Sequence, residues 1–281
     1  MNSAINSTFS TETTQQEPAE LRALALAWLI EPEPARKAQG VLQLREAWQQ
    51  GSVRLDVFAQ MKCDLGIPGK PQRPELVPPL DVKRRAMNTV EGRAALIHAL
   101  THIEFNAINL ALDAIWRFSD MPEKYYTDWL QVAQEEAYHF TLLSTHLVTL
   151  GFSYGDFPAH NSLWEMVERT QGDVIARMAL VPRTMEARGL DATPAIRAKL
   201  AQAGDQAAAG ILDIILRDEI GHVAIGNHWF AHLCDERKLD PISCYADLAR
   251  QFKAPKMRGP FNLDARRAAG FSEEELAALQ N

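Results

Sequence analysis

Apolar residues recur along most of the chain at the three- and four-residue spacing of an α-helix face, and no segment shows the strict alternation of a β-strand. Residues 18–50 contain two such stretches, ELRALALAWLI and ARKAQGVLQLREAW, which EPEP separates. Residues 66–80 contain five prolines and predict an extended linker. The pattern therefore predicts an all-α protein.

Four longer helices are expected after the linker, over residues 88–118, 120–150 and 162–189, with a fourth ending near 232. Two of them begin with a capping-box pattern, Asn88 with Glu91 and Ser162 with Glu165. Gly204 should separate the fourth helix from a short helix opening at Thr193-Pro194. Beyond residue 235 we expect a helical appendage, with Ser272 and Glu275 capping a last short helix.

The segment between the second and third helices, residues 151–161, is long enough to matter for topology. About ten extended residues span roughly 33 Å, and a 20-residue helix is about 30 Å long. This loop can therefore cross the whole length of a helical bundle.

Charged residues interrupt the apolar stripes at positions where another apolar residue is expected. Two segments share the pattern Glu-x-x-His, Glu136 to His139 and Glu219 to His222, and positions i and i+3 lie on one helix face. A lone Glu precedes each motif at a nearly equal distance, Glu104 in the first half and Glu186 in the second. The chain thus contains two half-sites of the same composition.

This composition predicts a centre of two metal ions, because four carboxylates buried together need compensating positive charge. Mixed carboxylate and imidazole ligands suit iron first, with manganese or a mixed Fe/Mn pair as alternatives. Because the set contains no cysteine, a structural zinc site is disfavoured. The predicted metal ligands are Glu104, Glu136, His139, Glu186, Glu219 and His222.

Two details of this ligand set stay open. Glu135 is a rival for Glu136, since it lies one turn before His139. Glu135 and Asp218 occupy the same slot before each motif, where they either accept a hydrogen bond from a ligand histidine or face solvent. Glu186 lies near Pro182, and proline inside a helix removes a backbone hydrogen bond, so the third helix is expected to be distorted there.

Other candidate groups have simpler interpretations. His98 and His102 lie one turn apart but point away from Glu104, which favours a structural role. His146 could line access to the site, and His160 and His228 are not expected to be ligands. Tyr138 and Tyr154 are either redox or acid–base groups, or packed with their hydroxyls hydrogen-bonded.

The composition limits the possible binding partners and the cellular compartment of the protein. The net charge of −7 argues against a nucleic-acid surface, although the cluster Lys83-Arg84-Arg85 could bind phosphate or RNA. Three separated cysteines indicate reduced thiols, and together with the absence of a signal sequence or a long apolar run they predict a cytoplasmic protein without a membrane anchor.

The second half of the chain resembles the ferritin-like superfamily, and more closely a bacterial ferritin-like family of unknown function. The segments that carry the resemblance are THIEFNAINLALD, DWLQVAQEEAYHF, YGDFPAHNSLWE, VPRTMEARGLDATP and ILRDEIGHVAIGNHWF. It implies a ferritin-like four-helix bundle with a long crossover loop, with Glu136 or Glu186 bridging the metals. The expected organisation is a disordered tail (1–17), an N-terminal helical segment and linker (18–85), the bundle (86–235) and a C-terminal helical appendage (236–281).

By the same resemblance, the leading hypothesis is a di-iron oxidoreductase that uses O₂ to oxidise a small organic substrate. The alternatives are a ferroxidase or iron-handling protein, a tRNA-modifying hydroxylase and a non-catalytic helical scaffold. The chain contains no glycine-rich dinucleotide fingerprint, so electrons would come from a partner protein or from the substrate. A homo-oligomer is compatible with all of these hypotheses.

Overall fold

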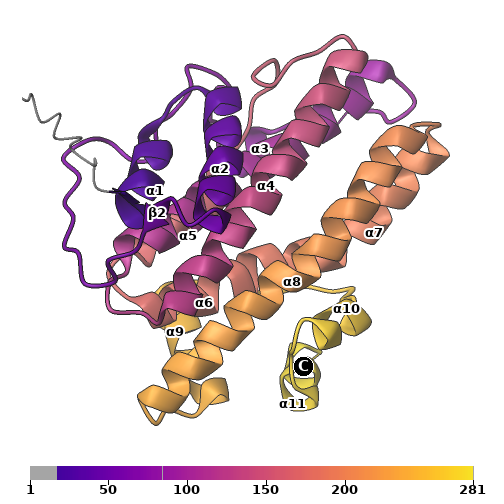
Figure 1. The fold of residues 1–281 in the computed structure, drawn as a ribbon. Coiled ribbons are helices and arrows are strands. Elements are labelled where there is room, and N and C mark those ends of the chain that lie inside the picture. The colour runs from indigo at the N-terminus through magenta and orange to yellow at the C-terminus, as the bar shows by residue number, and fades with distance from the viewer. Residues whose placement is uncertain (1–17, 84, 281) are drawn as a thin grey trace, which may run out of the picture.

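The computed structural model describes residues 18–83 and 85–280, and they are predominantly helical (Figure 1), which confirms the all-α class at that level. The predicted disordered tail, 1–17, lies outside the described residues. The only strands in the described part are β1 (Ala19–Glu20) and β2 (Val53–Arg54), which pair in parallel.

The two N-terminal helices form where the sequence predicts them, as α1 (Leu21–Ile30) and α2 (Pro34–Gln49). The Glu20 and Glu33 carboxylates cap their first turns by accepting hydrogen bonds from backbone N–H groups. The following segment is largely extended and contains one short 3₁₀ turn, η1 (Pro79–Asp81).

Four long helical segments form the centre of the molecule. Three are single helices, α3 (Val90–Arg117), α4 (Glu123–Thr149) and α8 (Gln206–Glu236). The remaining one consists of α6 (Val174–Leu180), the π-helical turn η2 (Val181–Glu186) and α7 (Ala187–Gln202), which continue one another without a break. We call this segment the composite helix. α1 packs on α3 and α2 on α4.

The prediction of one helix over 162–189 is right about its start at Ser162 but wrong about its continuity and its end. α5 (Ser162–Arg169) is separate, because the chain turns at residues 170–173 and Asp173 caps a new helix. The composite helix then passes Pro194, where the sequence predicts a helix start. Pro194 cannot donate to the Leu190 carbonyl, and the Asn262 side chain donates to that oxygen instead, at 3.2 Å.

Smaller boundary predictions also need correction. Thr89, rather than Asn88, caps α3, and Glu91 pairs with Arg85. The second helix begins three residues later than predicted, at Glu123, and α8 continues past 232 to Glu236. Gly204 does separate α7 from α8, with the positive φ of 86° that suits glycine.

The connection from α4 to the composite helix crosses the length of α3. Near its start, the Gly155 N–H donates to His98 Nε2 at 2.9 Å, close to the beginning of α3. Just beyond its end, Arg177 pairs with Asp113, near the end of α3. The loop 151–161 therefore makes only part of the crossing, and α5 completes it. As a result, the composite helix runs in the same direction as α4.

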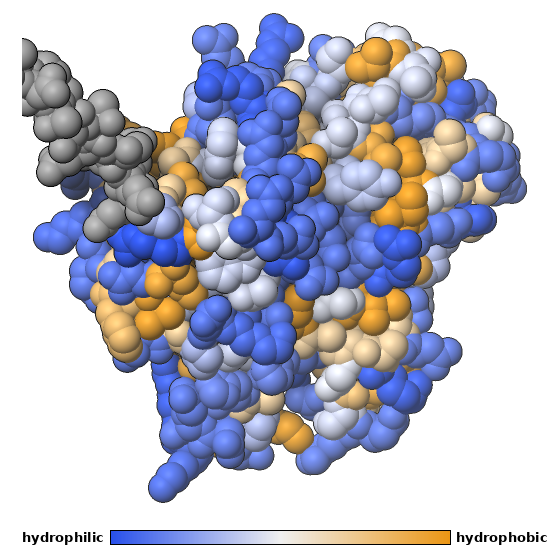
Figure 2. All heavy atoms as spheres, in the orientation of Figure 1, coloured by the Kyte–Doolittle hydropathy of each residue, from blue (hydrophilic) through white to orange (hydrophobic). Residues whose placement is uncertain are grey.

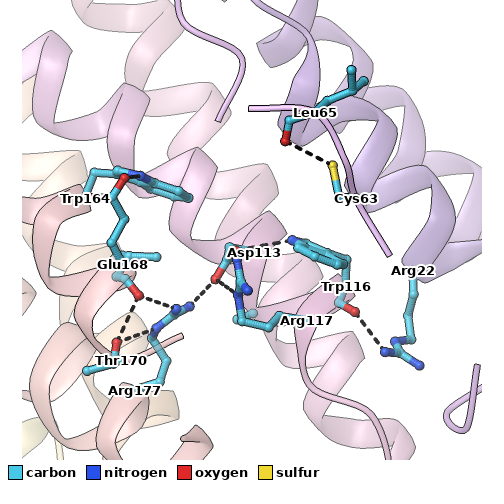
Figure 3. Close-up of polar contacts among 12 residues, drawn as sticks. Arg22, Cys63, Leu65, Asp113, Trp116, Arg117, Trp164, Glu168, Thr170 and Arg177 are labelled. Carbon is cyan, nitrogen blue, oxygen red and sulfur yellow. Dashed lines mark hydrogen bonds and ion pairs between the residues drawn. The ribbon is translucent and has the colours of Figure 1, made fainter. Parts of the chain in front are cut away.

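Asp113 is the polar anchor of this arrangement (Figure 3). It is fully buried and accepts hydrogen bonds from Arg177, Arg117 and the Trp116 indole. Arg177 also donates to Thr170 Oγ1 at 2.9 Å, which ties the end of the crossover to α3. Burial alone would raise the pKa of Asp113, but the two arginines outweigh it and lower the pKa.

The π-helical turn lies unusually close to α8. A Cβ atom added at Gly226 would lie 2.5 Å from Pro182 Cβ, so only glycine permits this approach. The Thr184 hydroxyl, in the turn, donates back to the Ala179 carbonyl of α6 at 2.8 Å. The distortion that Pro182 predicts is therefore present, as a widened turn rather than an unwound segment.

The C-terminal appendage consists of α9 (Pro241–Gln251), α10 (Leu263–Ala268) and α11 (Glu273–Leu279). The capping box of Ser272 and Glu275 is present as predicted. Arg183 pairs with Glu275, so the appendage is fastened to the π-helical turn.

Polar residues cover most of the face shown in Figure 2, and apolar ones form scattered groups. Within the described residues no helix has the length and apolar character needed to span a membrane.

Replacing Asp113 by Asn should lower the free energy of unfolding by about 3–5 kcal/mol, because the Arg177 charge stays buried without a counter-ion. Urea denaturation measures this loss. Since the pKa of Asp113 is lowered on folding, its contribution is present above its unfolded pKa and disappears as the pH falls through the folded pKa. The control Asp213→Asn, in an exposed pair with Arg197, should change stability little. Equal effects of the two variants would contradict this role.

Gly226→Ala should lower the free energy of unfolding by about 1–3 kcal/mol, since the new methyl group collides with Pro182. Gly210 lies on the same helix with open space around its Cα, so Gly210→Ala should instead stabilise by about 0.5–1 kcal/mol. Thermal unfolding of both variants checks the opposite signs. A stabilised Gly226→Ala protein would show that close packing does not hold the π-helical turn.

Candidate metal centre

The structure brings all six predicted ligands into the interior from four helical segments. The residues are Glu104 on α3, Glu136 and His139 on α4, Glu186 at the end of η2, and Glu219 and His222 on α8, and every one is buried. They lie near the middle of α3, α4 and α8, with apolar residues of the same stripes on both sides. The i, i+3 spacing on α4 and α8 directs each Glu and its His to the same side.

The ligand atoms face one another at short range. One atom from each of four residues lies within 4.8 Å of the others, a group made up of Glu104, Glu136, His139 and Glu219. His139 Nδ1 lies 3.3 Å from Glu104 Oε2 and 3.4 Å from Glu136 Oε2. Adjacent ligands about 2.1 Å from a shared cation are about 3 Å apart, so this cluster could hold a metal ion.

Glu136 lies between the two histidines. Its Oε2 faces His139, and its Oε1 lies 2.9 Å from His222 Nδ1. His222 Nδ1 is also 3.8 Å from Glu219 Oε2. One carboxylate thus presents a separate oxygen to each Glu-x-x-His motif, as a group shared by two half-sites would.

Each of the six side chains has at least one buried atom that makes no hydrogen bond. These atoms are Glu104 Oε2, both carboxylate oxygens of Glu136 and of Glu186, His139 Nδ1, Glu219 Oε2 and His222 Nδ1. Buried polar atoms without partners are rare in native proteins and cost free energy. Because the unpaired atoms are the ones that metals bind, the residues fit a metal centre.

The outer nitrogens of the two histidines are held by acids from the opposite motif. His139 Nε2 donates to Asp218 at 3.1 Å, and His222 Nε2 donates to Glu135 at 2.7 Å. This fixes each ring so that Nδ1 points inward, toward the carboxylates. Glu135 therefore supports a histidine, and Glu136 lies at the centre. The sequence identifies both acids but not the crossed pairing.

Without a cation, protons take over part of the charge compensation. Burial and the neighbouring carboxylates raise the pKa of Glu104, Glu186 and Glu219. Burial alone would lower the pKa of His139, but the nearby carboxylates of Glu104 and Glu136 outweigh it and raise that pKa to about 11. A metal that binds here must displace such protons, so its affinity should increase with pH.

A cavity of about 380 Å³ opens beside the carboxylates. Glu104, Glu186 and Glu219 line one part of it, and its other walls are mainly apolar side chains from α3, α7 and α8. The volume lies within the usual range of ~300–1,000 Å³ for small-molecule sites. Sequence reasoning missed this cavity, because it depends on how far α3 and α7 stand apart.

The other histidines and tyrosines lie outside the cluster. His102 bonds to Tyr154 OH at 2.8 Å and to Asn106, and both His98 and His102 have a pKa that burial lowers to about 4. These contacts agree with the predicted structural role. Tyr138 is 42% exposed. His146 bonds to Asp205 and does not line the cavity, whereas His160 does.

The fold and the site therefore define a helical protein with a buried Glu/His cluster suited to a metal. The chain belongs to a family described as protein of unknown function (DUF455), whose model matches residues 30–277. An uncharacterised protein of Haemophilus influenzae is 50% identical over 231 residues, which cover 80% of each chain. No solved structure matches the chain.

Glu135→Gln and Asp218→Asn should each lower the affinity for a divalent metal about 10–100-fold, because the ligand histidine loses the acceptor that orients it. Isothermal titration calorimetry with Mn²⁺ measures this change in affinity. Glu236 pairs with His232 far along α8, so Glu236→Gln is a matched control that should leave affinity unchanged. Unaltered binding in both site variants would mean that these acids do not support ligands.

Proposed function

We propose that this protein is a ferritin-like di-metal carboxylate oxidoreductase that binds two iron ions. The observation that carries the proposal is the set of unpaired ligand atoms, contributed by every one of the six predicted residues. Two divalent cations would neutralise the four glutamates, and the shared position of Glu136 supports its role as the bridging carboxylate.

The course of the chain supports the ferritin-like assignment. Ferritin-like bundles join two antiparallel helix pairs by one long crossover, and each pair contributes a Glu and a Glu-x-x-His motif. Here α3 and α4 form the first pair, the composite helix and α8 form the second, and the segment containing α5 joins them.

The reaction we propose is the O₂-dependent oxidation of an organic substrate in the adjoining cavity. In a hydroxylation, one C–H bond becomes C–OH, the second oxygen atom leaves as water, two electrons enter from a reduced electron-transfer protein, and two protons enter from the solvent. Bound iron would supply coordination positions for O₂ and pass the donor's electrons on to it. The chain's own part is to hold the ligands and to exclude water with apolar walls.

The cavity favours this function over iron handling. Hydrated iron needs a polar path, whereas the walls leading to Glu104, Glu186 and Glu219 are mainly apolar. A substrate with an apolar body fits such walls. Activity on tRNA remains an analogy with other ferritin-like enzymes and has no support from the cavity.

Protein purified under iron supply should contain about two Fe per chain, by the two-cation charge balance. Glu136→Ala/Glu219→Ala should lose the metal, and Glu165→Ala/Glu168→Ala, on α5 outside the cluster, should keep it. Metal analysis of the folded proteins makes the test. Folded wild-type protein that takes up neither iron nor manganese would overturn the proposal and favour the scaffold alternative.

A further inference from the structure

Two cavities follow each other along the groove between α3 and α7. The inner one, of about 380 Å³, borders the glutamates, and the outer one has a volume of about 330 Å³. Ile196 lines both. On α3 the lining passes from Glu104 and Leu100 to Leu96 and then to Gly92 at the outer end. The groove thus leads outward from the candidate metal centre.

The walls of this groove are mainly apolar. Its acidic side chains lie at the inner end, and most of its basic side chains lie at the outer end. The acids that line it are the three glutamates of the metal centre. The other charged lining residues are all cations, Arg188 in the inner cavity and Lys83, Arg85 and Lys199 in the outer one. Once bound metal neutralises the glutamates, the remaining field is positive and favours an anion.

Two of the outer cations are free to bind a ligand. Lys83 and Lys199 are exposed, and their side chains form no hydrogen bond or ion pair with the residues that the structure describes. Arg85 is already engaged, because it pairs with Glu91 and lies over the Phe157 ring. The two lysines come from different segments, one before α3 and one on α7, and both line the outer cavity.

We infer that the substrate is an amphipathic anion, with a linear apolar chain in the groove and a phosphate or carboxylate headgroup between Lys83 and Lys199. Leu96 and Glu104 are eight residues apart on α3, or about 12 Å at ~1.5 Å per residue. At ~1.2 Å per bond, a chain of about ten bonds spans that distance. The carbon nearest the metal would then be remote from the headgroup. This inference rests on the proposed function.

Calorimetry on Mn²⁺-loaded protein can test the inference with three probes: octyl phosphate, 1-octanol and inorganic phosphate. Octyl phosphate should bind at least about tenfold more tightly than octanol, the effect of one charge-assisted hydrogen bond. Its heat-capacity change should be negative, because an apolar chain is buried. Inorganic phosphate alone should bind weakly.

Lys83→Gln/Lys199→Gln should remove the preference for octyl phosphate over octanol. The matched control is Lys62→Gln/Lys256→Gln, two exposed lysines that line neither cavity, and it should retain the preference. Ala99→Trp, which fills the outer cavity, should weaken octyl phosphate binding while circular dichroism and metal content stay unchanged.

Equal binding of octyl phosphate and octanol by the wild-type protein would overturn the inference. So would a preference that persists in the lysine variant, since the headgroup would then lie at Arg188 or at the metals. Metal content measured on the same samples separates the two proposals. Full metal without anion preference overturns the substrate class alone, whereas absence of metal overturns the proposed function and, with it, this inference.

Discussion

The burial of four carboxylates in one helical core is the constraint on which the rest of the structure depends. Each glutamate occupies a position that the apolar stripe of its helix would otherwise fill, and an ionised carboxylate there is strongly unfavourable without compensation. The surroundings supply some of that compensation. His139 and His222 lie among the carboxylates, and their outer nitrogens are held by Asp218 and Glu135. The atoms left unpaired point to a cation as the remaining part.

Bringing Glu186 to this core requires a departure from regular helix. The π-helical turn over Val181–Glu186 ends at this ligand, and Gly226 lets the turn approach α8. Arg183, in the same turn, bonds to Asn227 and pairs with Glu275, so α8 and the appendage both hold it. Backbone hydrogen bonding stabilises a widened turn less than it stabilises an α-helix, and the contacts of Arg183 with Asn227 and Glu275 compensate for this. The C-terminal helices therefore help to position the candidate metal centre, although none of the predicted ligands lies on them.

The sequence predicts most of the helices, and the six residues that it singles out all lie buried in the helical core. Both follow because a 3.6-residue apolar stripe shows directly which helix face is buried. It failed where two signals compete. The helical pattern runs from Ser162 towards Gly189, but Asp173 caps a new helix, and the pattern alone does not show that break. The local pattern predicts a helix start at Pro194, whereas the helix continues through it because the Asn262 side chain donates to the Leu190 carbonyl, a long-range contact that the local pattern does not show. The crossed pairing of Glu135 and Asp218 depends on how α4 faces α8, which spacing along one chain does not contain.

The same carboxylate charges that are unfavourable in the core also determine whether metal or substrate binds first at the proposed site. Without metal, the groove contains three glutamates at its inner end, and any anion entering it meets these acidic side chains. With two divalent cations bound, those charges are compensated, and the lysines at the outer end set the sign of the field. Metal binding should therefore promote binding of an anionic substrate, and by linkage the substrate should in turn tighten metal binding. Such coupling would let one set of glutamates serve both to hold the metal and to exclude substrate until the metal is present.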